Sequence, residues 1–299
     1  MTVKPVAMTP AAAAVDEVEA SSMSLIEHLT ELRNRIIWSL LAFMAAMILC
    51  FFVWEPIYAF LTVPLCDALI ARGQECELVF LSVQEGFFLA FQISLIAGLL
   101  VSFPFISYQM WRFVAPGLYR NEKAAFLPFL LASPFMFFLG AFFAYYVVTP
   151  MAFTFFLGFQ DPGALAVEGE VVTDASAAMV FQGSAQSYLS LTMSFIVAFG
   201  LCFQLPVLLT LMGRAGIITS HALVRTRKYA VVAILILAAV ATPPDMMSQI
   251  ILFAAVYPLY EVSILLMRRH EKRVEAQMRA EGLLRPDESL YDDEPETKG

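Results

Sequence analysis

Residues 87–107 read FFLAFQISLIAGLLVSFPFIS, a stretch of 21 residues without one Asp, Glu, Lys or Arg. About 20 such residues are enough for a helix to cross a hydrocarbon core about 30 Å thick. The whole chain has the same character, because 60% of its 299 residues are apolar, 15% are charged and the mean hydropathy is +0.75. A soluble domain has roughly 45–50% apolar and 25% charged residues. We therefore expect a polytopic membrane protein.

Windows with little or no charge predict six membrane spans in all. They cover residues 36–54, 87–107, 125–149, 189–212, 229–242 and 248–267. The fifth span is short, since its 14 residues make only about 21 Å of helix, and the sixth is also expected to be short. Several spans contain prolines, which remove a backbone donor and bend a helix. The expected fold is an all-α integral membrane protein, with six transmembrane helices in a bent, concave assembly.

The distribution of charge predicts the orientation. If the N-terminus lies in the cytoplasm, 17 of the 18 Lys and Arg residues lie inside and only Arg72 lies outside, as the positive-inside rule requires. Six spans also place the C-terminus inside. We expect a disordered cytoplasmic tail over residues 1–22, a membrane domain over 23–267 and a charged cytoplasmic tail over 268–299. The net charge of -8 gives no reason to expect nucleic acid as a partner.

The four cysteines are too few for a disulfide scaffold. Cys50 and Cys202 fall inside apolar spans, where a thiol usually serves as a small packing residue. Cys66 and Cys76 share one outer loop in an oxidising compartment. Nothing in their spacing demands a disulfide, so the loop is compatible with either a bond or two free thiols.

An amphipathic helix is expected on the inner surface, before the first span. Apolar residues recur at helical spacing from Leu25 to Ile36, and the polar face carries Glu31 and Arg35. In one interpretation these two form an i, i+4 ion pair worth about 0.3–0.5 kcal/mol. In the other, Glu31 is a binding residue. The residues alone favour the ion pair.

Three further polar positions have similar alternatives. The loop expected at residues 108–123 is rich in aromatic residues, and Glu122 is its single acid, so neutralising a nearby basic residue is one role for it. Gln204 lies deep in the fourth span, where an amide usually bonds to a neighbouring helix. Glu261 lies near the inner end of the sixth span and is expected to reach the interface or pair with a basic residue.

Enzyme signatures are absent from the sequence. It contains no G-x-S-x-G elbow, no H-E-x-x-H zinc helix and no P-loop. The three histidines lie in predicted inner segments and not within spans. We expect neither an enzymatic activity nor a metal or cofactor.

Four motifs in order along the chain, together with the predicted topology, resemble the TatC family. TatC is the six-span receptor component of the Sec-independent twin-arginine protein translocase. The motifs are HLTELRNR at 28–35, FVAPGLYRNE at 113–122, FQLPV at 203–207 and TPPD at 242–245.

The resemblance implies a receptor in the bacterial inner membrane, in contact with lipid. Such a receptor binds the twin-arginine signal peptides of folded precursor proteins at its cytoplasmic face. It forms a multimer with TatB and recruits TatA, both single-span subunits, for export driven by the proton-motive force. The signal-peptide site carries over to Glu31, Glu122, Phe113 and Arg33.

Further positions of the family carry over to the outer loops and the spans. Pro64 and Asp245 match outer-loop positions, and Gln204 and Glu261 are candidates for contacts with partner helices. Many relatives have a Glu where this chain has Gln204, which puts any mechanism with a titrating carboxylate there in doubt. The alternative function is a polytopic solute or ion transporter. It predicts internal repeats and paired intramembrane charges, whereas the sequence shows one deep Gln and no repeat.

Overall fold

The computed structural model describes residues 25–114, 123–158, 183–241 and 246–285, and nearly all of them are helical. In chain order the elements are α2 (Leu25–Phe52), α3 (Trp54–Ile70), β1 (Leu78–Val79), α4 (Glu85–Val114), α5 (Lys123–Phe143), the π-helical turn η3 (Ala144–Val148), α6 (Thr149–Gly158), β2 (Gly183–Ser184), α7 (Ala185–Cys202), α8 (Leu205–Arg214), α9 (Ser220–Arg225), α10 (Arg227–Ala241) and α11 (Met246–Ala280).

Five helical stretches of this described part are long and apolar enough to cross a membrane. They lie in α2, in α4, in α5 to α6, in α7 to α8 and in α11. The expected fifth span is α10, whose 15 residues reach about 22 Å. That is less than the thickness of an undisturbed hydrocarbon core. The chain is thus a multi-pass membrane protein, while the count of six spans stays a prediction.

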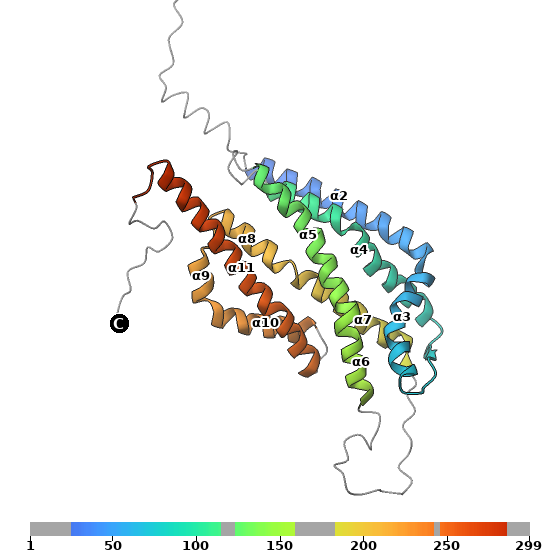
Figure 1. The fold of residues 1–299 in the computed structure, drawn as a ribbon. Coiled ribbons are helices and arrows are strands. Elements are labelled where there is room, and N and C mark those ends of the chain that lie inside the picture. The colour runs from blue at the N-terminus through green and yellow to red at the C-terminus, as the bar shows by residue number, and fades with distance from the viewer. Residues whose placement is uncertain (1–24, 115–122, 159–182, 242–245, 286–299) are drawn as a thin grey trace, which may run out of the picture.

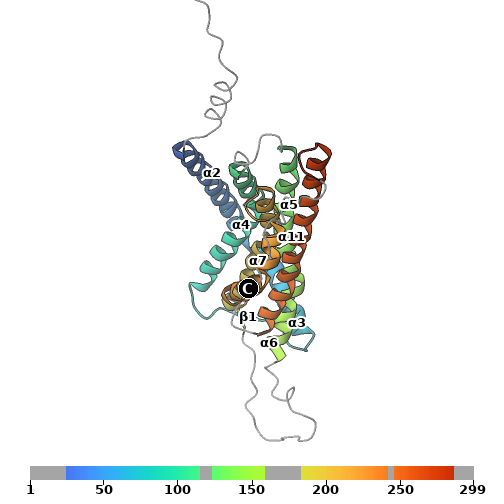
Figure 2. The ribbon, with the colours of Figure 1, turned by 90° about the vertical axis from the view of Figure 1, so that its left-hand side faces the viewer.

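Both termini of the helical body lie at one end of the molecule. Figure 1 shows the start of α2 and the end of α11 at the same end, with α6 and α3 at the other. We call these the inner end and the outer end, after the orientation expected from the charges. Figure 2 shows α2 and α4 crossing one another. They touch where Gly98 faces Met47, since a Cβ on Gly98 would lie 2.7 Å from the Met47 Cα. A small residue at a crossing lets two membrane helices approach this closely.

The core is centred on α7, whereas α2 lies at the edge of the fold. Of the 18 most apolar consecutive residues in the α7 to α8 stretch, half are buried. In α2 the corresponding share is 11%. Phe195 and Phe199 of α7 and Phe137 of α5 are among the largest fully buried side chains. The α5 and α7 backbones come close at Gly200, where a Cβ would lie 2.8 Å from the Phe137 ring.

Two of the long spans are bent by breaks in their helical hydrogen bonding. In η3 the Thr149 hydroxyl donates to the Ala144 carbonyl at 2.9 Å, and Pro150, which has no N–H, follows directly. The fourth span breaks at Phe203 and Gln204, between α7 and α8. Pro206 removes the N–H that would continue the helix there. These breaks support a bent assembly, and its concave shape stays a prediction.

Two expectations about helix boundaries near the inner end are wrong. The amphipathic helix is not a separate element, because α2 runs unbroken from Leu25 to Phe52 through a sequence without Pro or Gly. The loop expected to begin at Tyr108 is helical up to Val114, where α4 ends. The helix continues past the charge-free window because Trp111 is buried, 3% exposed, in a small apolar cluster.

The sixth span is also not short. It forms the 35-residue α11, which crosses the boundary expected at residue 267 without a break. Residues 268–280 contain neither Gly nor Pro, so nothing in the sequence stops the helix there. It ends before Gly282, whose φ of +73° is the left-handed conformation typical of a helix C-terminus. The N-terminal tail expected at 1–22 lies outside the described residues.

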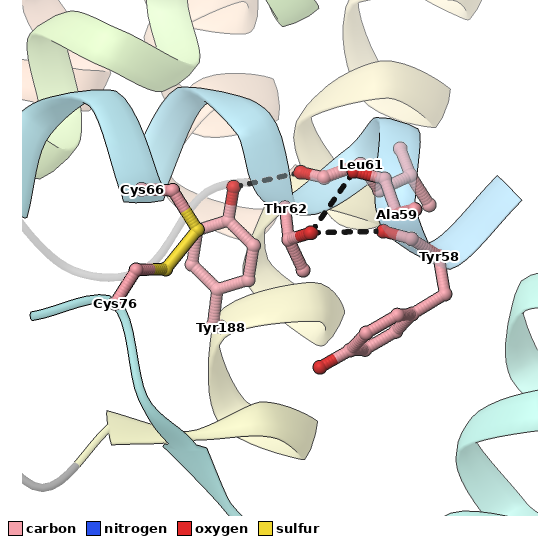
Figure 3. The surroundings of a disulfide bond; sticks show 7 residues. All are labelled: Tyr58, Ala59, Leu61, Thr62, Cys66, Cys76 and Tyr188. Atoms are coloured by element: carbon pink, nitrogen blue, oxygen red, sulfur yellow. Dashed lines mark hydrogen bonds between the residues drawn. A yellow bond between two sulfur atoms is a disulfide. The ribbon is translucent and has the colours of Figure 1, made fainter. Parts of the chain in front are cut away.

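At the outer end, the segment expected to be a loop contains the 17-residue helix α3. A disulfide joins Cys66, near the end of α3, to Cys76 in the following loop. In Figure 3 the Tyr188 ring of α7 lies beside this bond, and its hydroxyl donates to the Leu61 carbonyl at 2.8 Å. The structure therefore has one of the two alternatives that the spacing left open. The disulfide ties the loop to α3, and the Tyr188 hydrogen bond ties α7 to α3.

Candidate functional site

Glu31 and Arg35 form the i, i+4 ion pair that their spacing predicts. Arg35 Nε donates to Glu31 Oε1 at 3.0 Å, and a second guanidinium nitrogen donates to the same oxygen. Arg35 also reaches across to α4, where its Nη1 donates to Gln109 Oε1 at 3.3 Å. The guanidinium therefore connects α2 and α4 at the inner end of the molecule.

The ion pair leaves half of the Glu31 carboxylate unused. The Oε2 atom is buried and has no hydrogen-bond partner among the described residues. A buried carboxylate oxygen without a donor is unfavourable, by about 1–3 kcal/mol or more for a charged group. The Glu31 side chain is 22% exposed and that of Arg35 is 14% exposed. The site thus holds a partly buried negative charge, and one of its two oxygens has no donor among the described residues.

An apolar groove of about 460 Å³ lies between α2 and α4, and Arg35, the partner of Glu31, lines it. Its polar residues include Arg35 and Gln109, and its apolar walls include Leu32, Ile36, Phe43, Ile106 and Met110. At the inner end of the groove, the ring of Phe113 from α4 stacks on His28 from α2, with 4.4 Å between ring centroids. The stack holds Phe113 within one turn of Glu31.

Of the four expected signal-peptide residues, the structure brings two together. Phe113 lines the groove and stacks on His28, one turn of α2 before Glu31, and the Glu31 partner Arg35 also lines the groove. Arg33 is exposed and lies two residues from Glu31, on another side of α2. Glu122 lies outside the described residues.

Gln204 lies at the break between α7 and α8, and its amide bonds to Ser133 of α5. Its Oε1 accepts from Ser133 Oγ and its Nε2 donates to the Ser133 carbonyl, both at 2.8 Å. Ser107 of α4 donates to the Ser133 hydroxyl at 2.9 Å. The amide is therefore part of a polar contact among three helices of this chain, and it keeps one donor and one acceptor for other contacts.

Glu261 pairs with a basic residue, as expected for its position. Arg227, at the start of α10, donates to Glu261 Oε2 at 2.7 Å, and Tyr257 donates to Oε1 at 3.0 Å. The two charged side chains are 42% and 33% exposed, so solvent weakens their attraction. The pair joins α10 to α11.

Of the two outer-loop candidates, the structure describes Pro64. Pro64 is buried inside α3, where its missing N–H would otherwise face the Phe60 carbonyl one turn earlier. That carbonyl accepts instead from the Tyr145 hydroxyl of η3, at 2.6 Å. Pro64 thus frees an acceptor that holds α3 against the third span. Asp245 lies outside the described residues.

Sequence reasoning missed two residues at these sites. Gln109 was placed in a loop, although the helical spacing from Ile106 to Phe113 could have shown that it shares their face. Glu85 lies in the sequence between the first two expected spans, where an acid is usually exposed, yet it is 7% exposed. Its carboxylate accepts from the Leu81 N–H at 2.6 Å, the Ser184 hydroxyl at 3.0 Å and the Gln186 N–H at 3.2 Å. Glu85 therefore joins the loop before α4 to the start of α7.

Comparisons with known proteins agree with this architecture. Residues 27–254 match the family model described as Sec-independent protein translocase protein (TatC). A relative of the same name from Magnetococcus marinus is 40% identical over 271 residues, 90% of this chain and 93% of its own. One from Aquifex aeolicus is 36% identical and covers 82% and 94%. A crystal structure described as the twin arginine translocase receptor TatC has a TM-score of 0.68 at 36% identity, covering 81% of this chain and 98% of its own.

Proposed function

The chain belongs to the TatC family of Sec-independent protein translocase proteins, and we propose that it is the receptor for twin-arginine signal peptides. Family membership supports a component of protein translocation over the alternative of a solute or ion transporter. The observation that carries the proposal is the Glu31 carboxylate, whose Oε2 is buried and unpartnered among the described residues and whose ion-pair partner Arg35 lines an apolar groove.

A guanidinium suits this carboxylate better than an ammonium does. It is planar, always charged, and presents paired donors that match two carboxylate oxygens. Arg35 supports the proposal, because its guanidinium already lies against Oε1. An arginine of a signal peptide would donate to Oε2, or displace Arg35 and engage both oxygens. Glu122 would bind the second arginine, and its position after α4 in the sequence is compatible with that role.

The groove suits the other half of a signal peptide. Export signals combine a charged segment with an apolar segment of about 7–15 residues. The walls that α2 and α4 contribute are apolar, so an apolar helix can bury its side chains there while its arginines stay at the inner end. Phe113 would then pack against the signal peptide at the boundary between the two segments.

The orientation proposed is with both termini in the cytoplasm of a bacterium and the chain in its inner membrane. The charge bias supports it, since Arg72 is the single basic residue expected outside. The bond between Cys66 and Cys76 also supports it, because disulfides persist in an oxidising compartment such as the periplasm. Two independent properties thus support the same proposed orientation.

We assign TatB and TatA as the single-span partners of this receptor. Large apolar side chains along α2 are exposed in the single chain, among them Ile37, Leu41 and Leu49. Membrane helices associate through such faces by close packing and by occasional polar contacts. The proton-motive force would drive export by the assembled translocase, and Gln204, whose amide does not titrate, would not relay protons.

Photocrosslinking tests the proposed groove. A photoreactive residue replaces Ile36 at the groove, or Ile48 on the outer half of α2 as a control. Both are isoleucines of one helix with similar exposure, 56% and 51%. We expect a twin-arginine precursor to crosslink from position 36 and a Lys-Lys version to crosslink much less. Equal crosslinking of both precursors from both positions would contradict the proposal.

A further inference from the structure

A second charged hollow lies at the inner end, between α8 and α11 and away from the groove. It has a volume of about 230 Å³. Three arginines line it, Arg214 from the end of α8 and Arg269 and Arg273 from α11. Arg214 lies 4.6 Å above the centre of the Phe129 ring, which fixes one wall. We propose that this hollow binds the phosphate of an anionic phospholipid.

Charge within the hollow favours an anion. Glu271 is the one acid among its lining residues, and both of its oxygens are occupied by Ser220. One accepts from the Ser220 N–H at 2.7 Å and the other accepts from its hydroxyl. Arg269 and Arg273 are four residues apart on α11, a spacing at which like charges repel. A phosphate between them relieves that repulsion and takes paired donors from guanidinium groups.

Apolar surface next to the hollow favours a lipid over free phosphate. Leu266 and Met267 are among the residues that line it. From there Val262, Leu265 and Leu266 form an exposed apolar stripe along α11, each between 43% and 49% exposed. An acyl chain can lie on this stripe while its headgroup stays among the arginines. Basic pockets between membrane helices on the cytoplasmic side are typical sites for anionic headgroups.

Lipid binding to the purified full-length chain tests the site without any precursor. The chain is delipidated in detergent and titrated with phosphatidylglycerol, with phosphatidylcholine or with inorganic phosphate, and bound lipid is counted by native mass spectrometry. The test variant is Arg269→Gln/Arg273→Gln. The control is Arg268→Gln/Lys272→Gln, which removes two charges at the same spacing from the same helix. Both control residues are exposed and neither lines the hollow.

We expect preference for phosphatidylglycerol and a loss of about 25-fold in its affinity in the test variant, about fivefold for each charge. The control should stay within about twofold of the wild type. Equal losses in both variants would show general surface attraction and overturn the proposal. Displacement of phosphatidylglycerol by equimolar inorganic phosphate would assign the hollow to a free anion and overturn the lipid. Leu266→Gln should weaken the binding of phosphatidylglycerol while leaving the binding of inorganic phosphate unchanged.

Discussion

Gly140 of α5 lies so close to Phe199 of α7 that a Cβ on the glycine would stand 2.5 Å from the Phe199 carbonyl oxygen. A side chain at position 140 would therefore push α5 and α7 apart at the centre of the core. Because no hydrophobic force draws helices together within lipid, such close packing is what holds them. The position of α7, and with it the break at Gln204, therefore depends on residue 140 having no side chain.

Gly140→Ala should destabilise the fold by about 1–3 kcal/mol, the usual range for overpacking. The matched control is Gly86→Ala in α4, where a Cβ meets nothing within 4 Å and alanine improves helix propensity. Unfolding in mixed micelles measures both. Equal stability of the two variants would show that α5 and α7 tolerate a wider separation.

Gln204→Leu removes both bonds to Ser133 and should destabilise the fold by about 1–2 kcal/mol. Since these bonds hold α8 against α5, we expect the variant to weaken or misplace TatA or TatB while precursor binding stays largely intact. Gln204→Glu should remain functional, because a protonated carboxyl group can accept from the Ser133 hydroxyl and donate to the Ser133 carbonyl. Crosslinking from position 204 checks the partners. Full transport by the Leu variant, with no TatA or TatB crosslink, would leave Gln204 as an internal packing contact.

The disulfide predicts how many thiols react. In denaturant without reductant, only Cys50 and Cys202 should be alkylated, and all four cysteines should react after reduction. Intact mass distinguishes two labels from four. Cys66→Ser should lower stability by about 2–3 kcal/mol, as expected for a short closed loop. Four labels without reductant would show that the bond does not form in the isolated protein.

The sequence predicts best where one local rule decides the outcome. The pairing of Glu31 with Arg35 follows from i, i+4 spacing alone, and five of the six expected spans follow from apolar length. The amide of Gln204 was expected to need a partner because lipid offers none. Its choice of Ser133, 71 residues away in the chain, depends on how the helices pack, which no local pattern contains.

Helix ends and buried acids were predicted less well, for a related reason. Trp111 looks like an interfacial aromatic in the sequence, but it is buried against Phe129 and so extends α4. Glu85 looks like a solvated loop acid, whereas two segments far apart in the chain donate hydrogen bonds to it. In both cases long-range contacts override the local preference of the residue.

The affinity of a twin-arginine signal peptide for Glu31→Gln tests the receptor assignment most directly. The substitution keeps the size of the side chain and removes its charge. Glu275→Gln is the control, because Glu275 forms the same kind of i, i+4 pair with Arg279 elsewhere on the surface. We predict a loss of about five- to a hundredfold in Glu31→Gln, corresponding to about 1–3 kcal/mol, and unchanged affinity in the control. Wild-type affinity in Glu31→Gln, or equal binding of twin-arginine and Lys-Lys peptides by the wild type, would contradict the assignment and leave Glu31 as the structural partner of Arg35.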